Sequence, residues 1–352
     1  RYEEESDDAD IALEVDSLLE LANHHLKDVQ LKGHYRSKSL ELIDFSNKHF
    51  YDGNLKLLPD QRVVNSQEPA IEYIKHEGIW ENNTNFIEAN AVVELLLKTL
   101  NLDEEKSVGV VTFNAKQQQL ILDLIDELFI QSGKVFPNNW FVKNIENVQG
   151  DEKDIIIFST GYAPDKSGRM MMQFGSLNAA NGENRLNVAV TRAREKIIIV
   201  TSIYPQQLQV EGLKNEGPKL LKEYLIYAKD VSEGKFAPTP HPKSQHHVDW
   251  YLKQKLQTWA SDKIKNYTFT EELPFADVTV KKGEKYLGLI VTDDDLYYHS
   301  PSIKDMHVYT PFALSSKNWK FKGIFSREFW NDRERVEESI QRFIAINNPE
   351  ET

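Results

Sequence analysis

Residues 184–194 (NRLNVAVTRAR) run directly into residues 196–200 (KIIIV). The first segment has the spacing of a helix, and the second has the apolar composition of a buried strand. A helix over residues 182–194 that docks on this strand would hold two or three arginines in fixed positions. Fixed arginines are groups that proteins direct at the terminal phosphate of a nucleotide. The two segments together therefore indicate chemistry on ATP.

Two more segments rich in β-branched residues, 108–111 (VGVV) and 154–158 (DIIIF), have the pattern of strands buried on both faces of a parallel sheet. Helical patterns alternate with these strands, at residues 87–100, 116–129 and 182–194. Such alternation is typical of βαβ units with right-handed crossovers. We therefore expect an α/β fold, with a parallel sheet and helices on both of its faces.

The composition is that of a chain with two or three domains: 352 residues, 40% hydrophobic and 28% charged. The absence of cysteine excludes disulfides and thiolate metal sites, and it fits a cytoplasmic protein. No apolar run approaches the roughly 20 residues of a membrane helix. The net charge of −13 argues against a nucleic-acid partner. The acidic excess is local, however, so a basic groove elsewhere is compatible with this charge.

A proline-rich stretch, residues 234–242 (GKFAPTPHP), has three prolines in five residues and forbids regular structure. We expect a linker at 233–245, a first domain at 16–232 and a second at 246–352. The second domain is expected to contain helices at 247–261, 302–316 and 328–346, and strands at 275–280, 286–291 and 319–325.

Two polar segments carry further candidate residues. Residues 147–154 (NVQGDEKD) precede a buried strand, and their glycine would let the backbone approach a phosphate while a carboxylate accepts from a ribose hydroxyl. The alternative is an ordinary surface turn. In residues 32–37 (KGHYRS), an arginine beside an aromatic ring suits a nucleotide, by ion pairing and by stacking. The alternative there is an ordinary surface pair.

Taken in order, four segments resemble the second RecA-like motor domain of superfamily 1B helicases, the branch that includes the nonsense-mediated-decay helicases. They are residues 33–37 with 45–47 and 50–53, 108–118, 148–154 and 185–194. The resemblance covers about residues 15–205. It implies a RecA-like sheet, the P-loop NTPase fold, acting in an ATP-dependent helicase or translocase.

The resemblance also implies residue roles. Arg36 and Arg192 would be arginine fingers that stabilise charge on the γ-phosphate in the transition state. Tyr35 would stack beside the nucleotide, and Glu152 would contact the ribose. The other implied ATP-binding residues are Gln149, Gly150 and Arg185. For Arg194, a structural salt bridge and a phosphate contact both stay open.

On the nucleic-acid side, the resemblance places Thr112, Phe113 and Asn114 against a single-stranded backbone, with DNA as the expected strand. The sequence has no Gly-x-x-x-x-Gly-Lys-Ser/Thr loop to cradle phosphates. ATP and Mg²⁺ would therefore be held mainly by a first motor domain that this chain lacks. Residues 1–15, which open on Arg1 and are acidic, are expected to connect to that domain. The chain alone should not hydrolyse ATP.

Residues 246–352 resemble the restriction-endonuclease-like domain related to very-short-patch repair endonucleases. Such nucleases hold Mg²⁺ with two carboxylates, and Asp277 matches the first of them. Ile290 replaces the second, for which Asp293, Asp294 or Asp295 could substitute after a register shift. We therefore expect a degenerate nuclease fold, in which Asp277 is a plain surface or capping carboxylate. In the alternative to a motor with a nuclease-like accessory, this region is a non-catalytic module that docks DNA or protein.

Overall fold

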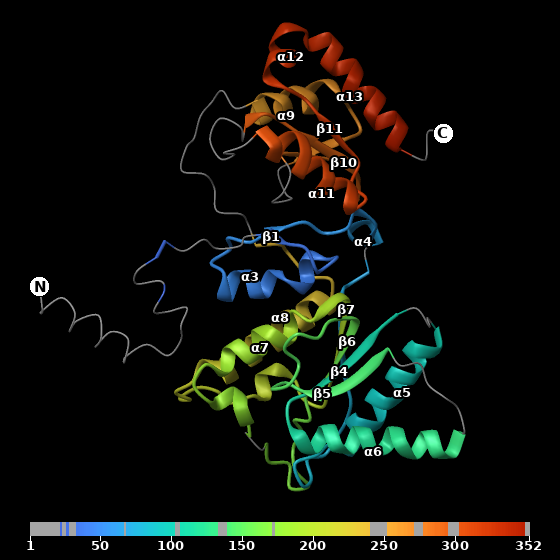
Figure 1. The fold of residues 1–352 in the computed structure, drawn as a ribbon, viewed down its shortest axis with the longest axis vertical. Coiled ribbons are helices and arrows are strands. Elements are labelled where there is room, and N and C mark those ends of the chain that lie inside the picture. Colours follow the sequence, from blue (N-terminus) through green and yellow to red (C-terminus); the bar gives the residue numbers. More distant parts are fainter. Residues whose placement is uncertain are drawn as a thin grey trace, which may run out of the picture. The chain divides into compact units, whose positions relative to one another are not determined.

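Five parallel strands form the main sheet (Figure 1) of this computed structural model, in the order β3-β7-β6-β4-β5. The structure describes residues 22, 26–27, 33–66, 68–102, 106–132, 139–170, 173–239, 252–270, 277–294 and 303–348. The strands are β3 (Ile71–Lys75), β4 (Val108–Thr112), β5 (Trp140–Asn144), β6 (Lys153–Ser159) and β7 (Ala193–Thr201). The three strands expected from the sequence lie at the centre of this sheet.

Helices cover both faces of the sheet, because alternate residues of each buried strand point to opposite sides. Ile156 and Phe158 pack with α7 (Gly182–Val190) and α8 (Glu216–Ser232). Their neighbours Ile155 and Ile157 pack with α5 (Phe86–Leu102) and α6 (Ala115–Ser132). This confirms the predicted RecA-like α/β fold. Among the described helices, none has both the length and the apolar character needed to cross a bilayer.

The helix predicted over residues 182–194 is too long, because α7 ends at Val190. The amide of Arg192 donates to the carbonyl of Ala189 at 3.1 Å, a tight turn that closes the helix. Ala193 is 1% exposed and already pairs with Lys153 in the sheet. A small apolar residue suits either a helix face or a buried strand, so apolar spacing alone did not locate this boundary. Arg192 therefore lies in a turn and Arg194 on a strand.

Short elements lead into the main sheet and follow it. They are β1 (Gly33–His34), η1 (Leu40–Leu42), α3 (Asp44–Phe50), β2 (Lys56–Leu57), α4 (Gln61–Ser66), η2 (Gly175–Asn178) and η3 (Pro205–Gln207). The sequence analysis did not identify β3, β5 or α8. These three elements lie at or beside the edges of the sheet, where the strands are only partly buried.

A second sheet has the order β11-β10-β9-β8, in which β10 and β11 are parallel and the other pairs antiparallel. Its elements are α9 (Leu252–Lys263), β8 (Thr268–Thr270), β9 (Val278–Lys282), β10 (Lys285–Val291), η4 (Asp305–Tyr309), α11 (Thr310–Ser316), β11 (Phe321–Gly323), α12 (Ser326–Asn331) and α13 (Arg333–Asn347). The single helix expected at 328–346 is wrong. Asp332 leaves helical geometry (φ −149°, ψ 87°), and its carboxylate caps α13 by accepting from the amide of Arg335.

An apolar cluster joins the second sheet to the segment that precedes the main sheet. Ile290 of β10 packs with α9, α12 and α13, whereas the neighbouring Leu289 packs on the other side, in a cluster with residues that precede the main sheet. That cluster contains Leu40, Ile43, Leu55, Leu57, Leu289, Leu314 and Trp319. Contacts divide the chain into two compact units, Arg1–Gly33 and His34–Thr352, so both sheets lie in one unit. The boundaries at 16–232 and 246–352 stay predictions, and residues 1–15 and 240–245 lie outside the described part.

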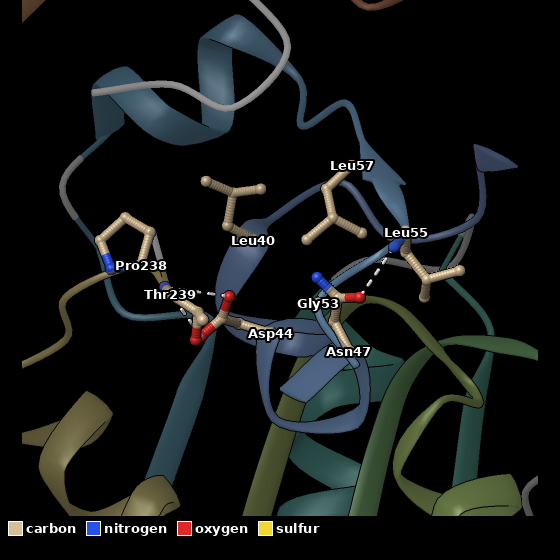
Figure 2. Close-up of a pocket in the computed structure, with 8 residues that line it drawn as sticks. All are labelled: Leu40, Asp44, Asn47, Gly53, Leu55, Leu57, Pro238 and Thr239. Carbon is tan, nitrogen blue, oxygen red and sulfur yellow. Dashed lines mark hydrogen bonds between the residues drawn. The ribbon is translucent and has the colours of Figure 1, made fainter. Parts of the chain in front are cut away.

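The first residues of the predicted linker are bound to α3 (Figure 2). The hydroxyl of Thr239 donates to the Asp44 carboxylate at 2.7 Å, and its amide lies 3.2 Å from both carboxylate oxygens. Asp44 is 5% exposed, and burial raises the pKa of its carboxyl. Nearby, the Asn47 side chain accepts from the amide of Leu55 at 2.9 Å. The chain therefore stays attached to the first part of the unit as far as residue 239.

Candidate functional site

Three of the predicted arginines lie where two central strands begin. Glu152 directly precedes β6, and Arg192 directly precedes β7. Because all strands of the main sheet are parallel, these ends lie along one edge, here named the amino edge. Arg36 reaches the same edge from the segment after β1. We define the arginine cluster as Arg36, Arg192 and Arg194 together with Glu152.

Glu152 holds two of these arginines. The Nε of Arg36 donates to Glu152 Oε2 at 2.7 Å, and the Nε of Arg194 lies 3.2 Å from Oε1. Arg194 Nη2 also pairs with Oε1. The hydrogen bonds from Arg194 and then from Arg36 lower the pKa of the Glu152 carboxyl. Both oxygens of this carboxylate thus already accept from arginines, and the ribose contact of Glu152 stays a prediction.

Arg192 is held differently. Its Nε donates to the carbonyl of Val188 at 2.7 Å, and its Nη atoms lie 3.4 Å from the carbonyl of Asp151 and 3.2 Å from the hydroxyl of Thr191. All of these acceptors are uncharged. Burial and then the charge of Arg36 lower the pKa of the Arg192 guanidinium. A half-buried cation that is bonded to neutral oxygens beside a second cation favours the approach of an anion.

Arg194 and Arg185 are each held by structural partners. Arg194 pairs with Glu152 and lies 3.5 Å from Asp154, and these contacts raise the pKa of its guanidinium. This geometry favours the salt-bridge alternative for Arg194. Arg185 lies on α7 and donates to the carbonyl of Ser176 at 2.9 Å. The described contacts do not join Arg185 to the arginine cluster.

Three more predicted residues line the amino edge with open surroundings. The side chain of Tyr35 is 79% exposed, although it directly precedes Arg36. Gln149 is exposed as well. Gly150 has a φ of +89°, and a Cβ built on it would meet no atom within 4 Å. The glycine is therefore required by the backbone conformation, while the space beside it stays open to a ligand.

Thr112, Phe113 and Asn114 lie at the carboxyl end of β4, on the opposite edge of the sheet, here named the carboxyl edge. Thr112 is 0% exposed, and its hydroxyl donates to the carbonyl of Asn114 at 2.9 Å. Phe113 is 6% exposed and packs in the core. Asn114 is half-buried and caps α6 by accepting from the amide of Gln117 at 2.8 Å. Two of the three side chains thus point inward, and the nucleic-acid role of this segment stays a prediction.

A buried carboxyl at the carboxyl edge escaped the sequence analysis. Glu88 on α5 is 0% exposed, and it accepts from the hydroxyl of Ser159 at 2.8 Å and the amide of Gly161 at 2.7 Å. Its other oxygen lies 3.2 Å from Asn85 Nδ2 and 3.4 Å from Ser202 Oγ. Burial raises the pKa of Glu88 to about 8. The spacing of Asn85 and Glu88 at the start of a helix resembles a capping box, which could have indicated the pair.

The two candidate nuclease carboxylates are engaged in local hydrogen bonds. Asp277 accepts from the amide and the hydroxyl of Thr292, at 2.7 and 3.2 Å. Asp293 accepts from the amide and hydroxyl of Ser326, the first residue of α12, at 2.9 and 2.6 Å. Over the described ranges, no three His, Cys, Asp or Glu residues form a group that could hold a metal. Asp277 thus joins the residue before β9 to the residue after β10, and Asp293 caps the start of α12.

Residues 15–204, more than half of the chain, match the sequence profile of the family described as "AAA domain". This chain belongs to the AAA domain family. The match includes the whole arginine cluster and both edges of the main sheet. It ends before the second sheet begins, so the AAA domain match gives no information on residues 252–348.

Two curated relatives of this AAA domain chain extend beyond that match. The "Uncharacterized ATP-dependent helicase MG140" of Mycoplasma genitalium is 40% identical over 256 residues, or 66% of this chain. Its homologue in Mycoplasma pneumoniae is 36% identical over 249 residues, or 65% of this chain. In both cases the aligned part covers 21% of the relative's length. The AAA domain chain therefore spans about a fifth of the curated relatives it matches.

Proposed function

We propose that this chain supplies the second motor domain of an ATP-dependent superfamily 1 nucleic-acid helicase or translocase, with Arg36 and Arg192 as arginine fingers. The observation that carries this proposal is the state of Arg192. It is half-buried, within the described part of the chain its hydrogen bonds go to neutral oxygens, and it lies close enough to Arg36 for their charges to interact. Arg36 differs, because its Nε pairs with the Glu152 carboxylate. Arg192, with Arg36 beside it, is suited to the terminal phosphate of ATP.

The residues of the amino edge fit a nucleotide. Arg36 and Arg192 would hold the terminal phosphate, the exposed ring of Tyr35 offers a stacking surface, and the open side of Gly150 admits a close approach. Bound ATP would supply the phosphoanhydride whose hydrolysis drives movement. Glu152 fixes the direction of the Arg36 guanidinium, since its carboxylate accepts from the Nε. Because the sequence has no phosphate-binding loop, ATP and Mg²⁺ would be gripped by another domain of the full-length protein.

The names of both curated relatives support the same role, because each is called an ATP-dependent helicase. A single-stranded nucleic acid, DNA in our proposal, would pass along the carboxyl edge. There the half-buried side-chain amide of Asn114 would contact a backbone without reading sequence.

The test is nucleic-acid-stimulated ATP hydrolysis by the full-length protein. Arg192→Ala and Arg36→Ala should each lower kcat by about 10³-fold, the effect of losing an arginine finger. Arg169→Ala is the matched control, because its side chain is 78% exposed and lies outside the cluster. A wild-type kcat in Arg192→Ala would defeat the finger assignment.

For the second sheet, the hydrogen bonds of Asp277 and Asp293 favour the alternative role of a docking platform without nuclease activity. Asp277 is bonded to Thr292 and Asp293 to Ser326, and the second sheet packs on residues that precede the main sheet. We expect the chain to leave DNA intact in the presence of Mg²⁺ or Mn²⁺. Metal-dependent cleavage that Asp277→Ala abolishes would restore the nuclease role.

A further inference from the structure

The loop at residues 317–319, between α11 and β11, contacts the segment that carries Arg36. Lys317 is the C-terminal cap of α11, and its ammonium donates to the carbonyl of Tyr35 at 2.9 Å. That carbonyl belongs to the peptide bond that leads into Arg36. A residue of the second sheet's region therefore touches the backbone directly beside a proposed finger.

Three more hydrogen bonds fix this loop to residues 59–61. The carbonyl of Lys317 accepts from the amide of Gln61 at 3.0 Å. The side-chain amide of Asn318 donates to the Asp60 carboxylate at 2.7 Å, and the indole of Trp319 donates to the carbonyl of Pro59 at 2.7 Å. Trp319 is 2% exposed and belongs to the apolar cluster that joins the second sheet to residues 40–57. These hydrogen bonds therefore hold the backbone of residues 317–319 in place.

Residues 59–61, which bind this loop, also contact the chain on the C-terminal side of Arg36. The amide of Asp60 donates to the carbonyl of Lys38 at 2.7 Å, and the amide of Lys38 donates to the carbonyl of Arg194 at 2.7 Å. The loop thus holds the chain on both sides of Arg36, at Tyr35 through Lys317 and at Lys38 through Asp60. Because the backbone is fixed on both sides of Arg36, the position of its Cα is restricted, and so is the reach of its guanidinium.

The environment of Lys317 is partly buried and contains charges of both signs. Within the described part of the chain Lys317 forms no ion pair, and burial lowers the pKa of its ammonium. Its neighbour His34 has a pKa of about 4, lowered by burial first and then by the charges of Arg36 and Lys317. Among the charges that act on Lys317, the Asp60 carboxylate attracts its ammonium more strongly than Lys38 repels it, and burial outweighs both. Holding a long lysine side chain on the Tyr35 carbonyl therefore costs side-chain entropy and hydration.

We propose that Lys317 is a positioning residue, which fixes the backbone of the Arg36 finger and thereby couples the second sheet to the amino edge. The expected effect on catalysis rests on the proposed function, whereas the expected effect on the backbone around Arg36 does not. The region of the second sheet is then a part of the motor that sets the reach of Arg36, rather than an independent attachment.

The structural part is tested on the 352-residue chain by hydrogen exchange. The reporters are the amide of Ser37, which donates to His34 Nε2 at 3.1 Å, and the amide of Lys38. Lys317→Met should accelerate their exchange by about 3- to 10-fold, the effect of losing one hydrogen bond. Lys317→Arg keeps a donor and should restore slow exchange. Lys265→Met, an exposed lysine elsewhere in the same region, is the control. Unchanged exchange in Lys317→Met overturns the inference.

The catalytic part is tested on the full-length protein. Lys317→Met should lower kcat for nucleic-acid-stimulated ATP hydrolysis about tenfold with little change in KM, and Lys317→Arg should recover most of it. Amides of β6 serve as an internal measure of folding, because a misfolded variant would exchange there as well. If Arg36→Ala inactivates but Lys317→Met does not, the positioning role is overturned. If Arg36→Ala keeps wild-type kcat, the proposed function fails instead, and the exchange of Ser37 and Lys38 still decides the contact.

Discussion

Replacing Glu88 by glutamine removes a titratable group that is buried at the carboxyl edge. The carboxyl of Glu88 is 0% exposed and is surrounded by neutral donors from Ser159, Gly161, Asn85 and Ser202. Among the described residues the groups that act on it are neutral hydrogen-bond donors, and burial raises its pKa to about 8. The folded chain therefore prefers the protonated carboxyl, whereas the unfolded chain ionises it near its ordinary pKa.

The sign of the effect follows from this difference. A carboxyl with a raised pKa in the folded state stabilises the fold fully below its ordinary pKa, and this contribution is lost as the pH rises towards 8. Between about pH 5.5 and pH 8.5 the loss amounts to about 3 kcal/mol, from about 1.4 kcal/mol for each pH unit in the window. Glu88→Gln cannot ionise and should lack this part of the pH dependence.

The assay is urea unfolding of the wild-type chain and of Glu88→Gln across that pH range. The glutamine variant should be less stable than the wild type near pH 5.5, by about 1–3 kcal/mol, because its amide group meets the donor of Asn85. The two unfolding midpoints should converge as the pH rises. Glu94→Gln, at an exposed position of the same helix, should follow the wild type at every pH. Parallel pH profiles for wild type and Glu88→Gln would refute the role assigned to this carboxyl.

Two other substitutions test the packing. A Cβ on Gly217 would lie 2.1 Å from the carbonyl oxygen of Leu177, so Gly217→Ala should destabilise the chain by about 2–3 kcal/mol in urea unfolding. Gly323→Ala should change the stability little, because a Cβ there would lie 3.7 Å from the Phe325 ring. Equal costs for the two variants would contradict the predicted clash. Asp332→Ala should lower the free energy of unfolding by about 1 kcal/mol, because it removes the cap of α13. Asp332→Asn keeps an acceptor and should lower it less. Equal stabilities of the two variants in thermal unfolding would reject the cap.

The strands at the centre of the main sheet were predictable because burial on both faces leaves an unbroken apolar run. Segments 108–111, 154–158 and 197–200 all lie within observed strands, and α6 lies close to its predicted position, whereas α7 ends four residues before the predicted end. The edge strands β3 and β5 were not predicted. Each is only partly buried and mixes polar with apolar residues, so neither shows a continuous run.

The partners of the candidate residues were beyond prediction, because they are set by contacts between distant segments. Glu152 was expected to meet a ribose, yet it binds Arg36, which lies 116 positions away in the sequence. Thr112 and Phe113 were expected to face a nucleic acid, but strand periodicity and core packing turn their side chains inward. Net charge was a poor guide for the same reason. The chain carries −13 overall, while the arginine cluster has three cations around one carboxylate.

Strands β6 and β7 each run from the arginine cluster at the amino edge to the surroundings of Glu88 at the carboxyl edge. Strand β6 begins directly after Glu152 of the arginine cluster and ends at Ser159, which donates to Glu88. Strand β7 contains Arg194 near its start and is followed by Ser202, which lies beside Glu88. A buried strand in a parallel ladder is stiff along its length, so a displacement at one end cannot be absorbed within it. In the proposed motor, β6 and β7 therefore join the nucleotide side to the nucleic-acid side, and Glu88 holds their far ends together.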